Sequence, residues 1–302
     1  MPSFPTHPAS LARSYPAKGD IAAARSLLEL CGVSAESTER LDILVADDAL
    51  RFDDSGVVSH VCSRMLPAES VYRLGPGAFV VSPAICFIQM ATVFKDIREL
   101  VEFGFELCGS YELDVASDGD YRERPPLATR NLIAAAVDML AGMRGVAVAR
   151  RALRYVREGA RSPMETAHAM TLVLPRRMGG AGASAVRMDY RIDIPPELRG
   201  LTRRLSVICD GCIPERMIDF EYNGFWHDGE ERRAEDEERR NVLEAMGYRV
   251  KVLNRFAFFS CGAFRRHLRS IFRILGIRED KLPCGFWDKQ EELRRFVLRR
   301  LL

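Results

Sequence analysis

The chain has 302 residues, of which 47% are hydrophobic and 28% charged, and its formal net charge is +2 at pH 7. This composition is that of a folded globular protein and excludes a disordered chain or a coiled coil. No window approaches the roughly eighteen apolar residues of a membrane span, so we expect a cytoplasmic protein without a membrane segment. The eight cysteines are too sparse for a disulfide scaffold, and we expect reduced thiols.

The two ends of the chain differ in charge. Residues 1–130 hold 12 basic and 19 acidic side chains, whereas residues 262–302 hold 11 basic and 5 acidic ones. A positive potential at the C-terminal end is compatible with a polyanionic partner, although a basic helix is often merely solvated.

The N-terminal part predicts an α+β module. Residues 20–32 have helical spacing that stops at Gly32, and residues 41–54, 57–66 and 71–82 read as short strands broken by glycine-containing turns. Residues 83–109 predict one long helix that covers this small sheet. The polar, acidic stretch 111–130 predicts a linker, so we place the domain boundary near residue 125, between domains 1–125 and 126–302.

The second domain alternates helices and strands. We expect helices at about 128–141 and 145–158, and a third from Ser162 to Leu174 that starts with a hydroxyl cap, a proline and Glu165. Residues 204–227 predict a hairpin with its turn near Pro214, followed by a charged helix, the strand 248–253, and helices at about 262–275 and 286–301. This order predicts an α/β fold with a mixed sheet flanked by helices.

The second strand of the hairpin, in "IDFEYNGFWH", carries an unusual set of polar groups. Side chains alternate along a strand, so Asp219, Glu221 and Asn223 share one face. Asp210 precedes Glu221 by eleven residues across the hairpin, which places two carboxylates side by side, where like charges repel unless a cation joins them. A solvated strand face is the alternative without function.

The charged helix after this hairpin has one informative stripe. Asp236, Arg239, Leu243 and Met246 recur at spacings of three and four, and the apolar end of the stripe must pack on the sheet. The stripe therefore carries Asp236 and Arg239 toward the sheet as well. Ion pairing within the helix is the alternative in a run as charged as "EERRAEDEERR".

Together these motifs resemble the very-short-patch-repair (Vsr-like) endonuclease group of the PD-(D/E)XK nuclease superfamily. Members of that group carry an Asp-bearing strand, a Glu-aromatic-Asp-Gly run, a histidine, and an Asp-x-x-Arg-x-x-x-Leu-x-x-x-Gly helix. Here the matching positions are Asp210, Glu221 to Gly224, His227, and Asp236 to Gly247, within about residues 150–255. The resemblance implies a restriction-endonuclease-like fold and Mg²⁺-dependent cleavage of DNA.

The resemblance also implies a role for each matching residue. Asp210, Glu221 and the main-chain carbonyl of Tyr222 would bind Mg²⁺, or Mn²⁺ in its place. Glu165 would orient the attacking water or a second ion, and His227 would act as general acid or base. Asp236 and Arg239 would support these groups. Glu165 could instead serve only as the capping partner of Ser162.

The sequence departs from the superfamily pattern at two positions. Asn223 stands where a lysine is usual, so it can position a water but supplies no charge, and Cys209 replaces the proline before Asp210. A catalytically degenerate nuclease kept as a DNA-binding regulator is therefore the rival interpretation.

Two further regions suggest partners. Arginines on the last two helices are candidates for phosphate contacts: Arg265, Arg266, Arg269, Arg273, Arg294, Arg295, Arg299 and Arg300. The N-terminal pattern "VVSHV…VVSPAICFIQMA" resembles abortive-infection antitoxins of the type IV toxin-antitoxin class. That resemblance implies that this module recognises a protein partner or a specific nucleic acid.

Overall fold

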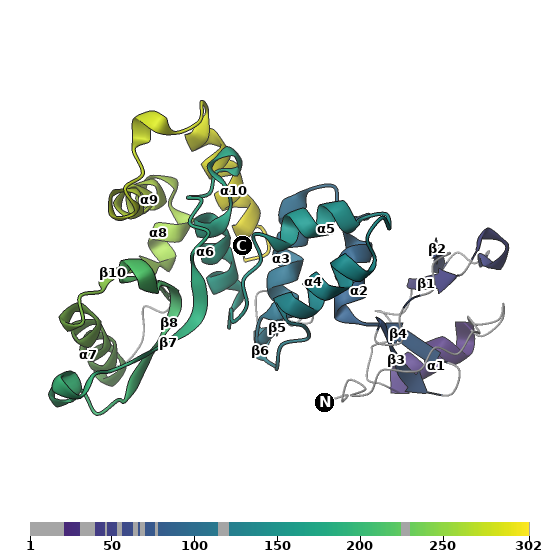
Figure 1. The fold of residues 1–302 in the computed structure, drawn as a ribbon, viewed down its shortest axis with the longest axis horizontal. Helices are drawn as coiled ribbons and strands as arrows, with labels where there is room; N and C mark the ends of the chain where they lie inside the picture. The colour runs from purple at the N-terminus through teal and green to yellow at the C-terminus, as the bar shows by residue number, and fades with distance from the viewer. Residues whose placement is uncertain are drawn as a thin grey trace. The chain divides into compact units, whose positions relative to one another are not determined.

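The computed structural model describes residues 21–30, 40–45, 47–52, 56–62, 66, 70–75, 78–113, 121–224 and 230–301. The chain forms two compact units, Met1–Cys86 and Phe87–Leu302 (Figure 1). Within the described residues, no helix is long and apolar enough to cross a membrane.

The first unit contains the helix and the short strands that the sequence predicts. Helix α1 spans Ile21–Leu30. Strands β1 (Leu41–Val45) and β2 (Val57–Val61) pair in parallel, whereas β3 (Val71–Gly75) and β4 (Ala78–Val81) form an antiparallel hairpin. The expectation of an α+β module is confirmed for these elements.

The single long helix predicted for residues 83–109 is wrong. Two helices form instead, α2 (Pro83–Met90) and α3 (Ile97–Cys108). The break has a local cause, because Asp96 caps α3: its side chain accepts from the Arg98 N–H, and Glu99 accepts from the Asp96 N–H. This capping box stabilises a new helix start inside an otherwise continuous apolar pattern.

The described parts of the predicted linker, residues 111–113 and 121–130, are packed in the second unit. They include strands β5 (Tyr111–Leu113) and β6 (Tyr121–Glu123), which pair in antiparallel fashion. The Tyr111 side chain is fully buried and its hydroxyl lies 2.9 Å from the Thr166 hydroxyl. The N–H groups of Leu127 and Ala128 donate to the Leu107 carbonyl. The division between units therefore falls at residues 86 and 87 instead of near 125.

The second unit is built around one mixed sheet of four strands in the order β10-β9-β8-β7. Strands β7 (Arg187–Asp193), β8 (Ser206–Ile213) and β9 (Ile218–Asn223) are antiparallel neighbours, and β10 (Arg249–Asn254) lies parallel to β9. The predicted hairpin is confirmed, with its turn at Pro214–Arg216. The helices of this unit are α4 (Arg130–Met139), α5 (Val146–Leu153), α6 (Pro163–Val173), α7 (Glu230–Ala245), α8 (Arg255–Phe259), α9 (Cys261–Leu275) and α10 (Phe286–Leu298).

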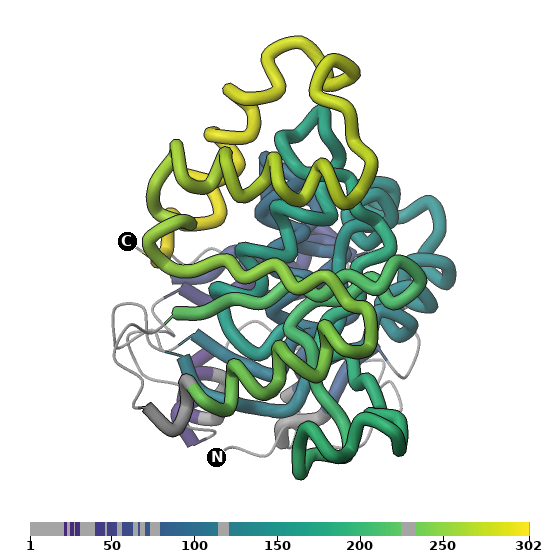
Figure 2. Tube along the Cα trace, turned by 90° about the vertical axis from the view of Figure 1, so that its left-hand side faces the viewer, coloured from purple at the N-terminus to yellow at the C-terminus, as the bar shows by residue number. Residues whose placement is uncertain are grey.

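Helices cover both faces of this sheet. Val242 and Leu243 of α7 pack in one core cluster with Val207 and Cys209 of β8. On the other face, the ring of His168 in α6 meets the ring of Phe220 edge-on, with 6.4 Å between centroids. In Figure 2, β10 runs between α7 and the segment formed by α8 and α9. The two faces of β9 therefore contact different helices, and its alternate residues have different surroundings.

Gly104 in α3 tests whether this helix belongs to the second unit. A Cβ added there would lie 2.5 Å from Cγ2 of Val156 and 2.9 Å from the Phe87 ring. We expect Gly104→Ala to lower the free energy of unfolding by about 1–3 kcal/mol, because overpacking outweighs the gain in helix propensity. Urea denaturation followed by circular dichroism measures the change.

Gly262 in α9 is the matched control, because an added Cβ would meet only the end of the flexible Arg266 side chain, at 3.7 Å. Gly262→Ala should therefore be neutral or stabilising by up to about 1 kcal/mol. Equal effects of the two substitutions would contradict the packing of α3.

Candidate metal centre

Five carboxylates line one cavity of about 840 Å³ in the second unit: Asp236, which is on α7, and a group of four, Glu165, Asp210, Asp219 and Glu221. These four come from the start of α6 and from the neighbouring strands β8 and β9. The predicted residues Tyr222, Asn223, Asp236 and Arg239 line the same cavity. The structure thus brings the predicted residues together and adds Asp219. His227 lies outside the described residues.

Asp210 stands where β8 and β9 separate. The ladder between the strands ends at the pair Gly211 and Phe220. Beyond it, the Tyr222 N–H donates to the Asp210 side chain, with 3.0 Å between N and Oδ2. This bond fixes the carboxylate beside Glu221. Burial, followed by the charge of Glu221, raises the pKa of Asp210 to about 6.

Glu221 is held by Arg239, whose guanidinium donates to both carboxylate oxygens and also to the Ile208 carbonyl, 2.6 Å away. Arg239 thus reaches from α7 to the sheet, as the stripe predicted, and its pairing lies across the structure instead of along the helix. Burial still dominates and raises the pKa of Glu221 to about 8. Asp236 differs from the prediction of a buried position, because it is exposed, although it lines the rim of the same cavity.

Asp219 is the most unusual group of the cavity. Its residue is fully buried, and neither carboxylate oxygen has a hydrogen-bond partner among the described residues. Burial raises the pKa of Asp219 to about 8. Strand alternation indicated that Asp219 shares a face with Glu221, but no sequence pattern assigned it a ligand role. An acid flanked by Ile218 and Phe220 in an apolar strand was the available signal.

Glu165 has two roles that the sequence presented as alternatives. It takes part in the start of α6, because its N–H donates to the Ser162 hydroxyl and its Oε2 accepts from the Arg161 N–H at 2.8 Å. Its carboxylate also lines the cavity. Burial, followed by the charge of Asp210, raises the pKa of Glu165 to about 7. Capping therefore does not remove this group from the cavity.

Arg161 was missed by sequence reasoning. It lies in the turn before α6, and its guanidinium donates to Oδ1 of Asp210 at 3.2 Å. Within the described residues, Arg161 pairs with Asp210 and Arg239 pairs with Glu221, whereas no ion pair joins an arginine to Glu165 or Asp219. Arg240, Arg255, Arg299 and Arg300 also line the cavity, so its lining as a whole has no excess of negative charge. A cation would be attracted by the closely spaced carboxylates themselves.

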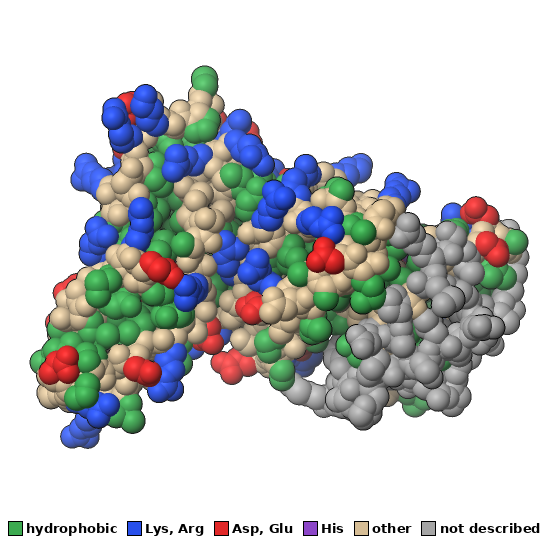
Figure 3. Space-filling model, in the orientation of Figure 1, with side chains coloured by type: hydrophobic (Ala, Val, Ile, Leu, Met, Phe, Trp, Pro, Cys, Tyr) green, Lys and Arg blue, Asp and Glu red, His purple; other side chains and the backbone are tan. Residues whose placement is uncertain are grey.

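The arginines predicted to contact phosphate differ in their surroundings. On α9, Arg266 and Arg273 are exposed, while Arg265 and Arg269 each lie 5.0 Å from the centre of the Trp287 ring. Figure 3 shows basic side chains on the surface around this helix. Arg269 is also paired with Glu279, and Arg295 with Glu291.

Three arginines near the C-terminus bond to carbonyl or carboxylate groups of the second unit. Arg294 is buried and donates to the carbonyls of Phe258 and Phe259, so its predicted phosphate contact is wrong. Arg299 pairs with Glu102, and Arg300 with Glu106 at 3.2 Å. The last two nevertheless line the carboxylate cavity.

The donor set fits a divalent cation in general. Carboxylate oxygens are the ligands that Mg²⁺ prefers, and the unpartnered oxygens of Asp219 are free to accept one. Comparison with known proteins adds nothing to this assignment, because no family model, curated protein or solved structure matches the chain. The functional argument therefore depends on the cavity alone.

The pair of Arg239 and Glu221 should be critical for stability. Arg239→Met leaves a buried carboxylate without its cation, so we expect a loss of about 3 kcal/mol at about pH 10, above the pKa of about 8 at which Glu221 ionises. Near pH 5 the loss should be smaller, because Glu221 can then bind a proton. Chemical denaturation at the two pH values measures both. Arg240→Met, at the exposed neighbouring position, should change little, and a loss as large as that of Arg239→Met would refute this role.

We expect the contribution of Asp219 to the free energy of unfolding to fall as the pH rises. Its pKa is higher in the folded state than the ordinary value of 3.8, so folding favours the protonated form. This contribution is fully present below pH 3.8 and is lost as the pH rises toward about 8. A pKa difference of one between folded and unfolded states corresponds to about 1.4 kcal/mol.

We therefore expect Asp219→Asn, in the presence of a chelator, to flatten the decline in unfolding free energy between about pH 5 and about pH 8. Asp193→Asn is the control, because Asp193 is exposed on the edge strand of the same sheet. Parallel pH profiles for wild type and Asp219→Asn would show that Asp219 is ionised normally.

Proposed function

We propose that this protein is a metal-dependent endonuclease that hydrolyses phosphodiester bonds in DNA. The observation that supports it is the set of four carboxylates from α6, β8 and β9 in one cavity, of which Asp210 and Glu221 are paired with an arginine in the described residues and Glu165 and Asp219 are not. Such a cluster is costly for folding, so we attribute it to chemistry that needs a cation. The mixed sheet with helices on both faces is compatible with a restriction-endonuclease-like domain.

In this proposal Asp210, Glu221 and the main-chain carbonyl of Tyr222 hold Mg²⁺, or Mn²⁺. The ion would polarise the scissile phosphate and lower the pKa of a bound water. Glu165, with a pKa near 7, is suited to accept a proton from that water at neutral pH. Asn223, exposed at the end of β9, would orient the water or the phosphate by hydrogen bonding.

The surroundings of the cavity suit an anionic substrate. Arg240, Arg255, Arg299 and Arg300 line it together with the carboxylates. Arg266, Arg269 and Arg273 follow one another on α9 at spacings of three and four, and so form a stripe that can follow a phosphate backbone. These contacts would supply affinity without reading sequence.

Cleavage of plasmid DNA tests the proposal. Asp210→Asn and Glu221→Gln keep the shape of the side chain and remove its charge, so each should lower the Mg²⁺-dependent rate by about 100-fold or more. Asp193→Asn should cleave as the wild type does. Wild-type protein that cuts neither double-stranded nor single-stranded DNA with Mg²⁺ or Mn²⁺ would overturn the proposal.

The rival function is a DNA-binding regulator without catalysis. Arg239 already occupies both oxygens of Glu221, Arg161 contacts Asp210, and Asn223 carries no charge where a lysine is usual. A site of this kind can be stable without a cation. DNA binding of equal strength with and without divalent ions, unchanged in Asp210→Asn and never followed by cleavage, would favour the regulator.

A further inference from the structure

We infer that Cys209, Asp219 and Glu221 form a binding site for a transition-metal dication of the Zn²⁺ type. This site shares Glu221 with the proposed Mg²⁺ site but uses two other residues. It does not depend on nuclease activity, since it follows from the position and chemistry of its own ligands.

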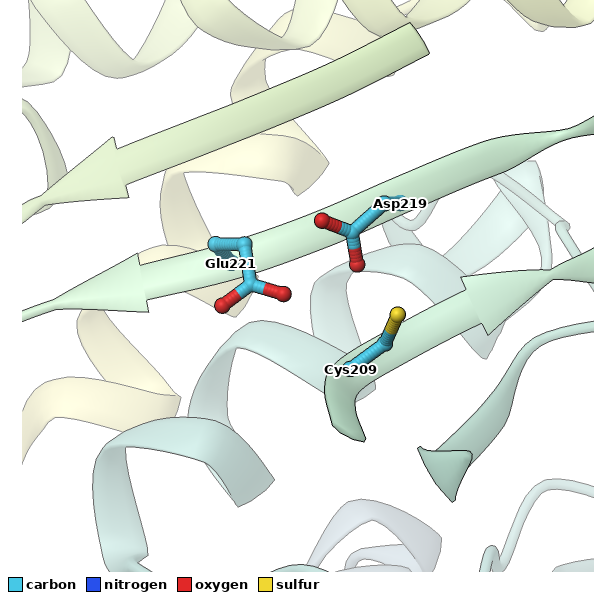
Figure 4. Close-up of side chains that lie close together, drawn as sticks. All are labelled: Cys209, Asp219 and Glu221. Atoms are coloured by element: carbon cyan, nitrogen blue, oxygen red, sulfur yellow. The ribbon is translucent and has the colours of Figure 1, made fainter. Parts of the chain in front are cut away.

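The geometry brings three ligand atoms together. The Cys209 sulfur and one oxygen from each of Asp219 and Glu221 all lie within 4.8 Å of one another. Figure 4 shows both carboxylates on β9 with Cys209 on the neighbouring strand β8. Bonds from Zn²⁺ to sulfur are about 2.3 Å and to carboxylate oxygen about 2.0–2.2 Å long. To reach these bond lengths from a spacing of up to 4.8 Å, the side chains would have to rotate toward the ion.

Asp219 supplies the independent observation that a ligand belongs there. Its residue is 0% exposed, and both of its oxygens are without a hydrogen-bond partner in the described part of the chain. Buried carboxylates are normally paired, hydrogen-bonded or bound to metal. No arginine or lysine of the described residues pairs with Asp219, and its carboxylate is directed at the sulfur and at a second carboxylate. A cation between them would satisfy it.

The sulfur decides which cation fits. Mg²⁺ takes oxygen ligands, whereas thiolate together with carboxylate suits Zn²⁺ and its close analogue Co²⁺. Binding converts the Cys209 thiol to a thiolate, and the displaced proton passes to solvent. Glu221 can serve Arg239 and the metal together, because its two oxygens offer about four acceptor positions.

Cys212 provides a matched comparison on the same strand. It is also fully buried and stands opposite Asp219 in the ladder of β8 and β9, but it is not one of the three clustered ligands. Removing this sulfur should leave the metal bound. Cys261 and Cys284 are exposed and would bind added metal unspecifically, so both are replaced by serine in the parent protein for the test.

The experiment titrates this full-length parent protein with Co²⁺ after treatment with a chelator. We expect the protein to bind one equivalent of Co²⁺ and to show the charge-transfer absorption of a sulfur-cobalt bond. Zn²⁺ should displace the bound Co²⁺, and excess Mg²⁺ should not. Absence of the sulfur-cobalt absorption in the parent protein overturns the inference. This measurement needs no further substitution and so does not depend on whether a variant folds.

Variants then assign the ligands. Cys209→Ser should abolish the absorption and Cys212→Ser should retain it, with folding checked by circular dichroism. Asp219→Asn should weaken Co²⁺ binding by about ten-fold or more. Asp210→Asn should keep the absorption even though it stops any cleavage, which separates this site from the proposed function. Absorption retained in Cys209→Ser, or lost in a folded Asp210→Asn, contradicts the assignment.

Discussion

The structure of the second unit depends on how four carboxylates, two buried and two half-buried, are neutralised. Glu221 and Asp219 are almost completely removed from solvent on the face of β9 that α7 covers. The pair of Arg239 and Glu221 joins that helix to the sheet through both oxygens of the carboxylate. A pair buried in this way makes a modest net contribution to stability, but the loss of either partner leaves an uncompensated charge. The position of α7 is therefore tied to the charge state of the cavity.

Arginines and a metal cation would share the same carboxylates. Arg161 and Arg239 approach the carboxylates from the turn before α6 and from α7, and among the described residues they pair with Asp210 and Glu221 only. Burial is the main cause that raises the pKa values of Glu165, Asp210, Asp219 and Glu221 above their ordinary range. A bound divalent cation would lower all four pKa values. The folded state would then lose less stability as the pH rises. Binding of metal, protonation of the acids and stability of the fold are thus linked.

The sequence predicted the parts of this arrangement that follow from periodicity. The hairpin of β8 and β9 follows from two apolar runs around Pro214, and the direction of Arg239 follows from its helical spacing to Leu243. Strand β7 was not predicted. Most of its residues are charged or exposed and only Ile192 is buried, so its sequence resembles that of a loop. The break before α3 carried a capping signal in Asp96 and Glu99, but the apolar spacing on both sides masked it.

Tertiary contacts decided the remaining features. Residues 111–130 are polar enough for a linker, yet the burial of Tyr111 against α6 makes them part of the second unit. Arg294 looks like its neighbours in the sequence but satisfies buried carbonyls of α8. The contact of Arg161 with Asp210 joins residues 49 positions apart, and no local pattern indicates it. The isolation of Asp219 is likewise visible only once its surroundings are known.

The most direct test is a crystal structure of the protein soaked in Mn²⁺, with anomalous diffraction recorded at the manganese absorption edge. The account predicts an anomalous peak bonded to oxygens of Glu221 and of Asp210 or Asp219. Crystals in which these carboxylates contact only Arg161 and Arg239, with no anomalous peak in the cavity, would contradict it.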